Sequence, residues 1–532
     1  MPADRTFDQI MEAIQAADRD RALSLAVDAC KGGDRQPLVL MLAAEWMEAN
    51  GKPQDALRLL QEATIKERDE PELWRRLGQL LTRFGQLPDA VAAFEEALDL
   101  DPDNLAVLLP AGEASYRSGM LRKALGFFER ADEIQAHQPD TIAAIAAVHA
   151  GLRDADRARA YAERALRIAP ANQTAHVAMA RAELLAGDTE QAAARAAGLA
   201  KLKDSNKVLA LDLLAEALDV LDRPAQAFEA YRLRNSLVEK SLRQTPELRD
   251  RRVGQAHRIA AWLGSPAAEA PHDPVSNSSP AAGHAFIIGF PRSGTTLLEK
   301  SLAGHPHVLT LPEIDLLQTA GTAFLANDFA LERLSNASAQ DLQPFVDLYW
   351  EGAKKALGTP LEGKVLIDKL PLHTLALPLI ARMFPAARII FAIRDPRDVV
   401  LSCFRRRFQL NSAMYEFLQL DRTARFYDAV MTLGTKGMEA LNLPVLEVRH
   451  EAIVRDFDGR MAKILAFIGL EMNPGVHDFA QQAKDNPRTP SDLQLLKGLN
   501  EDGFDQWRRY RAHLEPVLGI LDPWVRHFDY PQ

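Results

Sequence analysis

The chain has 532 residues, 47% of them hydrophobic and 26% charged, so it can bury more than one core, and a mainly disordered state is excluded. Its 73 acidic residues outnumber its 63 basic residues, and the net charge of -10 argues against a general binder of nucleic acid or anionic membranes. Two cysteines, Cys30 and Cys403, leave no basis for a disulfide framework or a cysteine-rich metal cluster.

The N-terminus, MPADRTFDQIMEAIQ, is polar and acidic and lacks the basic start and apolar core of a secretory signal. No apolar run approaches the roughly 18 residues that span a bilayer. We therefore expect a cytoplasmic protein without a membrane span or a nucleic-acid partner.

Small residues recur at 34-residue steps through the first half of the chain. One column holds Ala22, Ala56, Ala90, Ala124, Ala158 and Ala192, and a second holds Gly51, Gly85, Gly119 and Gly187. Within the clearest unit, residues 70–103, two apolar stripes at helical spacing flank a turn that contains glycine. Each unit is therefore predicted to be a helical hairpin, with a left-handed turn at the glycine. Arg153 replaces that glycine in one unit.

This pattern resembles tetratricopeptide repeats, with roughly seven units between about residues 2 and 238. With a helical extension, the predicted repeat domain covers residues 1–263. The resemblance implies an all-α superhelix whose concave face holds a peptide or protein partner. A spacer or a dimerisation surface is the alternative, and the sequence does not choose between them.

Residues 264–284 are rich in Pro, Ser and Ala and are predicted to form a linker. Beyond them, short apolar strands alternate with helical stretches, which is typical of an α/β domain with a central parallel sheet, here residues 285–532. The predicted strands are 285–289, 364–368, 388–393 and 444–450.

The first of these strands leads directly into GFPRSGTT, residues 289–296, and then into an amphipathic helix. Backbone N–H groups and a helix N-terminus at such a junction attract phosphate oxygens. A phosphoryl-transferring loop needs lysine at the position of Thr295, so a nucleoside triphosphatase is not favoured, and a small-molecule kinase is kept as an alternative.

The loop is similar to the 5′-phosphosulfate loop of sulfotransferases that use 3′-phosphoadenosine 5′-phosphosulfate (PAPS). The resemblance implies a P-loop-like sulfotransferase fold without an obligatory metal. It also implies donor-binding roles for Arg292, Ser293, Gly294, Thr295 and Thr296.

A second motif, RIIFAIRDPRDVVLSCFRRRF, begins at Arg388. Arg394 ends a strand, Asp395 is suited to cap the following helix, and Ser402 and Arg406 share one face of that helix. The resemblance implies that Arg394 and Ser402 bind the 3′-phosphate of PAPS, and Arg406 matches an arginine of the tyrosylprotein sulfotransferase branch. The alternatives are a solvated arginine face and Asp395 as a metal ligand.

Two further residues carry the chemistry that the resemblance implies. Glu313, placed at the start of a helical stretch, matches the catalytic base of tyrosylprotein sulfotransferases; its alternative role is a first-turn acid that favours the helix dipole. Lys369, just after a strand, matches a lysine that works beside Arg292 to stabilise the transferring sulfuryl group. Asp315 stands where the branch has an arginine that engages acidic peptides, so the acceptor is left open among protein tyrosine, phenol, alcohol and saccharide.

The C-terminal segment from Asn486 to Pro516 resembles the PAPS-covering segment of the same family. The resemblance implies that Ser491 lies near the scissile bond and that Lys497 and Asn500 contact the nucleotide. The alternative is a solvated loop that Trp507 anchors.

The combined hypothesis is a PAPS-dependent sulfotransferase fused behind a tetratricopeptide array, with 3′-phosphoadenosine 5′-phosphate (PAP) as the product. The alternatives are a small-molecule kinase and a scaffold whose α/β domain binds nucleotide without turnover.

Overall fold

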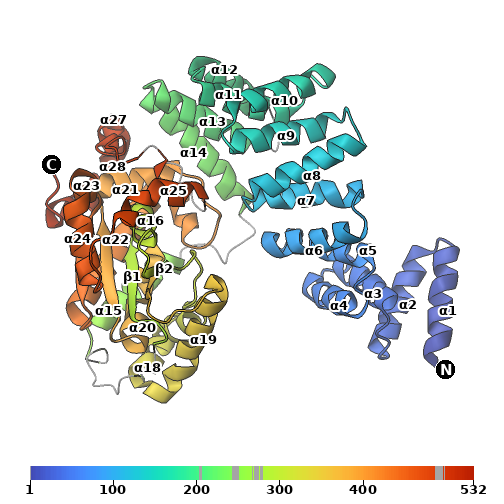
Figure 1. The fold of residues 1–532 in the computed structure, drawn as a ribbon, viewed down its shortest axis with the longest axis horizontal. Coiled ribbons are helices and arrows are strands. Elements are labelled where there is room, and N and C mark those ends of the chain that lie inside the picture. The colour runs from blue at the N-terminus through green and yellow to red at the C-terminus, as the bar shows by residue number, and fades with distance from the viewer. Residues whose placement is uncertain are drawn as a thin grey trace. The chain divides into compact units, whose positions relative to one another are not determined.

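The computed structural model describes residues 2–202, 206–242, 251–266, 268, 275, 279–485, 495–496 and 498–532 (Figure 1). The chain divides into two compact units, Met1–Leu221 and Asp222–Gln532. None of the described helices combines the length and the apolar composition needed to cross a bilayer.

The first unit consists of helices that pack against their sequence neighbours as hairpins (Figure 1). They are α1 (Pro2–Gln15), α2 (Arg19–Lys31), α3 (Pro37–Ala49), α4 (Pro53–Lys66), α5 (Pro71–Arg83), α6 (Leu87–Leu100), α7 (Leu105–Arg117), α8 (Leu121–Ile134), α9 (Pro139–Gly151), α10 (Ala155–Ile168), α11 (Gln173–Ala186), α12 (Thr189–Ala200) and α13 (Lys207–Val220). The predicted array of helical hairpins is confirmed.

Small residues set the close approach of these helices. A Cβ atom on Gly78 would lie 2.6 Å from the Phe94 ring, and the same distance separates a Cβ on Gly112 from the Phe128 ring, one 34-residue step later. The alanine column is fully buried at several steps, including Ala56 and Ala90. A larger side chain at these positions would force the two helices of a hairpin apart.

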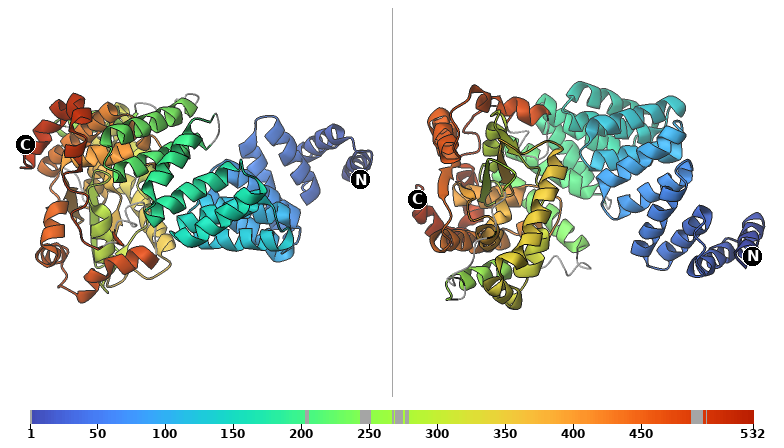
Figure 2. Two further views of the ribbon diagram at one scale, coloured as in Figure 1. Left: turned by 90° about the horizontal axis from the view of Figure 1, so that it is seen from above. Right: turned by 60° about the horizontal axis from the view of Figure 1, so that its bottom comes forward.

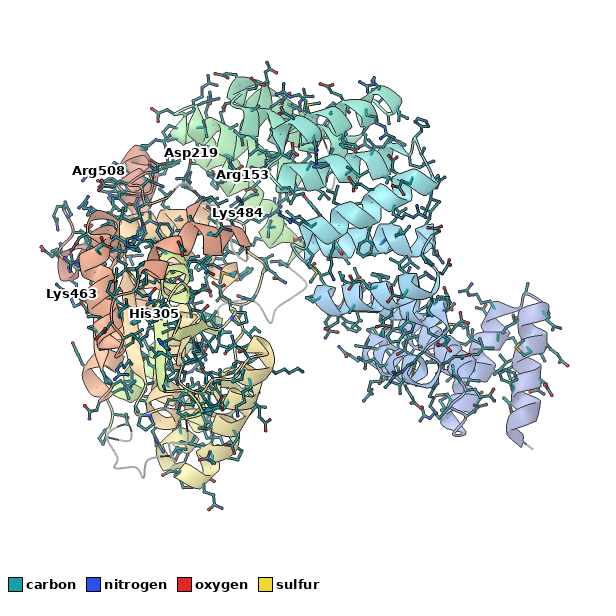
Figure 3. The ribbon with its side chains drawn as sticks, viewed as in Figure 1. Arg153, Asp219, His305, Lys463, Lys484 and Arg508 are labelled. Carbon is teal, nitrogen blue, oxygen red and sulfur yellow. The ribbon has the colours of Figure 1, made fainter. Side chains whose placement is uncertain are left out.

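The turn after the first helix of each hairpin is left-handed, as predicted. Gly51, Gly85, Gly119 and Gly187 have φ between 72° and 90°. Arg153, labelled in Figure 3, keeps the same conformation at φ 63° in spite of its Cβ. The packing of the repeat helices therefore holds even a non-glycine residue in the left-handed region.

The second unit is built on a five-stranded parallel sheet in the order β2-β3-β1-β4-β5. Its strands are β1 (Gly283–Gly289), β2 (Val308–Thr310), β3 (Val365–Lys369), β4 (Arg388–Ile393) and β5 (Val445–Arg449). Four of them match the predicted strands, and the short edge strand β2 was not predicted. The parallel α/β fold is confirmed.

Helices cover both faces of the sheet (Figure 2). They are α14 (Pro224–Ser241), α15 (Arg251–Leu263), α16 (Thr295–Ala303), α17 (Gln318–Phe324), α18 (Asp328–Asn336), α19 (Ala339–Leu357), α20 (Leu377–Met383), α21 (Pro396–Arg405), α22 (Leu420–Ala440), α23 (His450–Arg455), α24 (Phe457–Phe467), α25 (Phe479–Asp485), α27 (Gln506–Arg509) and α28 (Arg511–His527), with short 3-10 turns η2 (Pro371–Ala376), η3 (Met414–Leu418) and η4 (Pro474–Asp478). On β1, Ala285 and Ile287 pack against α16 and α24, while Phe286 packs against Tyr349 and Phe384 on the opposite face.

The division between the units lies earlier than the predicted linker at 264–284, of which residues 267, 269–274 and 276–278 lie outside the described residues. Helices α14 and α15, expected to extend the repeats, belong to the second unit because α14 packs on α21 and α15 on α22. The expected grouping of residues 222–263 with the repeats is therefore corrected: their apolar faces are buried against the α/β unit.

Candidate active site

The loop between β1 and α16 has the strained geometry of an anion cradle. Gly289 has φ 146°, and a Cβ there would lie 2.5 Å from the carbonyl oxygen of Ala392 on β4. Gly294, at φ 88°, is the N-cap of α16, and Arg292 is held at φ 73°. The backbone N–H of Gly289 donates to the Thr374 hydroxyl at 3.0 Å, which fixes the base of the loop. The N-terminus of α16 therefore lies directly at this loop, and the first N–H groups of a helix, which lack intrahelical partners, favour a bound anion.

The structure brings the two predicted phosphate motifs together. Nε of Arg292 donates to the hydroxyl of Ser402 at 3.0 Å, although the residues are 110 positions apart. Arg394, at the end of β4, donates to the Arg292 carbonyl at 3.3 Å. Burial, and then the guanidinium groups of Arg406 and Arg394, lower the pKa of Arg292 to about 9. The buried Arg394 and the half-buried Arg292 and Arg406 thus lie close together, and a bound anion would relieve their mutual repulsion.

The helix start of the second motif forms as predicted. Asp395 is the N-cap of α21 and accepts the N–H of Arg397 at 2.9 Å, with Pro396 at the first helical position. The guanidinium of Arg397 also pairs with the Asp395 carboxylate at 2.7 Å. The carboxylate of Asp395 is therefore engaged by an arginine and a helix start, which is not the environment of a metal ligand. No cluster of three potential ligands occurs among the described residues.

The predicted catalytic pair lies at the neighbouring strand end. Nζ of Lys369, which is 1% exposed, contacts Glu299 of α16 at 2.9 Å and also the carboxylate of Glu313. Burial by itself would lower the pKa of Lys369, but the two carboxylates raise it above its ordinary value. The lysine is therefore a buried cation shared between a helix residue and a loop residue.

Glu313 does not begin a helix, contrary to the prediction. It lies in the loop between β2 and α17, and α17 starts only at Gln318. The dipole role that was its alternative is therefore wrong, because no helix N-terminus is adjacent. Its side chain is 39% exposed and reaches Lys369 from the solvent side.

Asp315, two residues further along this loop, is the exposed end of a chain of polar side chains that continues into the interior. Its carboxylate lies 3.4 Å from Nε2 of His373, whose Nδ1 lies 3.5 Å from Asp368. Asp368 accepts the Tyr349 hydroxyl at 2.9 Å. Burial would lower the pKa of His373, but Asp368 and Asp315 raise it above its ordinary value. The carboxylate at position 315 is thus paired with the His373 ring, while its side chain stays 47% exposed.

Among the residues that the structure describes, Nε of Arg394 and Nδ1 of His450, both buried beside the loop, find no hydrogen-bond partner. A Cβ on Gly294 would lie 2.4 Å from the same His450 atom, so the imidazole presses directly on the loop. Burial, and then Arg394 and Arg292, lower the pKa of His450 to about 3, which keeps the ring neutral. Orphaned groups of this kind, next to a cationic cradle, fit a polyanionic nucleotide.

The C-terminal segment is described in part. Ser491 and Lys497 lie outside the described residues. Asn500 forms a local turn, in which its side chain donates to the Gly498 carbonyl at 3.0 Å. Arg394 also donates to the carbonyl of Gly503, which ties this segment to the second phosphate motif.

Trp507 anchors the segment, as the alternative interpretation proposed. Trp507 is 1% exposed, the Arg397 guanidinium lies 3.9 Å from its ring centroid, and the backbone N–H of Trp507 donates to Asp398 at 2.8 Å. The predicted anchor and the predicted nucleotide contacts are compatible, because the anchor holds the end of the segment against α21.

Glu299, Thr374 and His450 were not assigned to the site from the sequence. Glu299 stands four residues after Thr295 on the loop helix, a spacing that places it on the same face and that was readable in the sequence. Thr374 and His450 come from segments far from the loop, and only the folded chain brings them to it.

Comparisons with known proteins agree with this geometry. Residues 285–474 match the sulfotransferase family. Residues 48–105 and 81–148 match tetratricopeptide repeat families. Both resemblances inferred from the sequence are therefore confirmed.

The similar proteins are distant. An uncharacterized protein of Aquifex aeolicus is 25% identical over 46% of this chain and 33% of its own length, so the chain spans about a third of that relative. Protein-tyrosine sulfotransferase 1 of Danio rerio is 27% identical over 46% of this chain and 71% of its own. Among solved structures, a tetratricopeptide repeat protein from Parabacteroides merdae is 13% identical over 44% of this chain and 92% of its own, with a TM-score of 0.35.

Proposed function

We propose that the second unit transfers a sulfuryl group from PAPS to a hydroxyl acceptor. The observation that carries this proposal is the contact between Arg292 and Ser402, which joins the two phosphate motifs beside Arg394. The acid and lysine of a transfer site, Glu313 and Lys369, meet at the end of the neighbouring strand. The sulfotransferase family match over the same residues adds support.

The donor would be held at two places. The loop N–H groups, together with Arg292, Ser293, Thr295 and Thr296, bind the 5′ end. Arg394, Ser402 and Arg406 bind the 3′-phosphate, and Ser491, Lys497 and Asn500 cover the nucleotide. When bound, PAPS supplies a sulfuryl group on a phosphate leaving group.

The residues of the chain divide the transfer between them. Glu313 accepts the proton of the acceptor hydroxyl as its oxygen forms a bond to sulfur. Lys369 and Arg292 stabilise the negative charge that grows on the bridging oxygen as the bond from sulfur to phosphate oxygen breaks, and PAP leaves. Glu299 holds the buried Lys369 at the junction of loop and strand, so little reorganisation is needed.

The pairing of Lys369 with Glu313 links donor binding to the proposed base. The anionic donor competes with Glu313 for the Lys369 ammonium group. When the ammonium group moves to the donor, the Glu313 carboxylate loses this ion pair and can accept a proton. Donor binding would thus prepare the base.

The acceptor is a hydroxyl compound without the acidic flanks of a tyrosine sulfation site. Asp315 carries negative charge where an acidic peptide would need a cation, and its pairing with His373 keeps it ionised. The tetratricopeptide repeats would bind a protein, either the acceptor itself or a partner that delivers it.

Calorimetric titration with PAP tests the donor. We expect micromolar binding without metal and no gain from replacing PAP by ATP and Mg²⁺. Arg394→Ala should weaken PAP binding at least tenfold, about 1.4 kcal/mol, because it removes the cation at the 3′-phosphate. A metal-dependent preference for ATP would instead support a kinase.

A further inference from the structure

Helix α14 carries a buried arginine whose guanidinium group is hydrogen-bonded to the C-terminal turn of another helix, α21. Arg234 is 1% exposed and donates to the backbone carbonyls of Phe404 at 3.2 Å and Arg405 at 3.0 Å. Its neighbour Asn235 donates to the same Phe404 carbonyl at 3.0 Å and accepts from the Arg234 guanidinium. Both residues therefore engage the last turn of α21.

This interaction suits the end of a helix. The last carbonyls of a helix lack intrahelical partners, and the negative end of its dipole favours a cation. Arg234 and Asn235 supply the hydrogen bonds that buried carbonyls at this end would otherwise lack. The last turn of α21 is thereby held in one position.

The same turn of α21 faces the phosphate loop on its other side. The Ser402 hydroxyl accepts from Arg292, and the Cys403 thiol donates to the carbonyl of Pro291 at 3.4 Å. Arg406 is the C-cap, and its N–H donates to the Ser402 carbonyl at 3.2 Å. One turn of helix thus connects α14 with both parts of the proposed donor site.

Further contacts fix α14 in place. The Phe228 ring stacks on Phe404, with 5.1 Å between centroids, and on His513 at 4.2 Å. At the other end of the helix, Glu239 pairs with Arg422 at 2.9 Å and accepts from Tyr415 at 3.2 Å. The helix is therefore anchored along its length within the second unit.

We infer that α14 is a positioning element of the donor site, in which Arg234 holds the end of α21 so that Ser402 and Arg406 meet the 3′-phosphate. The inference rests on the proposed function and extends it to a helix outside the sulfotransferase family match, which begins at residue 285. Because α14 follows the last helix of the repeat unit after three residues, Leu221–Arg223, the chain joins the repeats directly to this element.

The test compares two ligands on full-length variants. PAP carries a 3′-phosphate and AMP does not. Only the affinity for PAP should therefore depend on the position of the end of α21. Arg234→Lys keeps the charge but loses the two-carbonyl geometry, and Arg234→Met removes both. Arg232→Met is the matched control, since Arg232 lies on the same helix in an exposed pair with Glu229.

We expect Arg234→Lys to lower the affinity for PAP about tenfold, because loss of a charge-assisted hydrogen bond commonly has an effect of this size. The affinity for AMP should stay within about twofold of the wild-type value. Arg234→Met should lower PAP affinity further, and the control should change neither. Arg234→Lys and Ser402→Ala should also be non-additive in a double-mutant cycle, because both act on one turn.

Equal PAP affinity in Arg234→Lys and the wild type would overturn the inference while leaving the proposed function standing. An equal loss for PAP and AMP would also overturn it, because the role would then be general stability. If Arg234→Met does not fold, the PAP affinity of Arg234→Lys and the double-mutant cycle with Ser402→Ala still test the inference. If the wild-type protein fails to bind PAP, the proposed function falls and this inference with it.

Discussion

Glu313 and Lys369 form the residue pair on which turnover should depend. Replacing Glu313 by Ala removes the proposed base without touching the phosphate motifs. We expect kcat to fall about 10²- to 10⁴-fold while PAP binding is retained. Steady-state kinetics with a sulfated-product assay, beside calorimetry, measures both quantities.

A matched control for this variant is Glu351→Ala, since Glu351 is exposed on α19. It should leave kcat and PAP binding unchanged. Unchanged turnover in Glu313→Ala would remove Glu313 from the mechanism and would favour a nucleotide-binding scaffold.

Asp398 makes stability sensitive to pH near neutrality. Burial is the main cause that raises its pKa to about 7, against the opposing effect of Arg394, from an ordinary value of 3.8. The folded protein therefore holds a proton here more tightly than the unfolded chain. This contribution to stability is complete below about pH 3.8 and is lost as the pH rises through about 7.

Asp398→Asn should remove that dependence, because an amide imitates the protonated acid and still accepts the N–H of Trp507. The thermal midpoint of the variant relative to the wild type should rise as the pH is raised from about 4 to about 7 and stay level above that. A difference that stays constant over this range would show that Asp398 is ionised throughout.

Among the elements, the turns of the repeats keep a left-handed conformation even where the residue at the turn is not glycine. Arg153 adopts φ 63° where its counterparts are glycines. A side chain in this region costs roughly 1–2 kcal/mol, partly offset in Arg153→Gly by the greater freedom of glycine in the unfolded chain.

Arg153→Gly should therefore raise the free energy of unfolding of the repeat unit by about 0.5–1 kcal/mol. Gly119→Ala, at φ 81° with nothing near its Cβ position, should lower it by a similar amount. Urea unfolding of both variants measures the change. Loss of stability in Arg153→Gly would mean that the arginine side chain makes contacts worth more than the strain.

Elements also differ in how well they could be predicted. The strands β1, β3, β4 and β5 are apolar runs bounded by turns, and the sequence indicates them within two residues. β2 is three residues long and lies at the sheet edge, so its pattern is too short to detect. Glu313 was misplaced for a related reason: Pro312-Glu313 is a common helix start, and only the loop that follows β2 shows otherwise.

At the scale of the whole molecule, the candidate site is assembled from segments far apart in the chain. The phosphate loop, Lys369 at the end of β3 and Arg394 after β4 lie together because β1 pairs in parallel with both strands, which brings their carboxyl ends to one edge. Before the structure, the resemblance to sulfotransferase motifs implied that these residues share one site. The partners Glu299, Thr374 and His450 were not assigned, because their contacts depend on which faces of the helices meet the sheet.

The sequence by itself determined the repeat register, the parallel α/β architecture and the loop that attracts phosphate, since each follows from short-range periodicity and backbone sterics. Only the tertiary structure decided that Lys369 is shared between Glu299 and Glu313, that Asp315 is held by His373, and that α14 belongs with the α/β unit. These contacts join residues tens to hundreds of positions apart. They form because burying a whole helix face stabilises the fold more than any local preference opposes it.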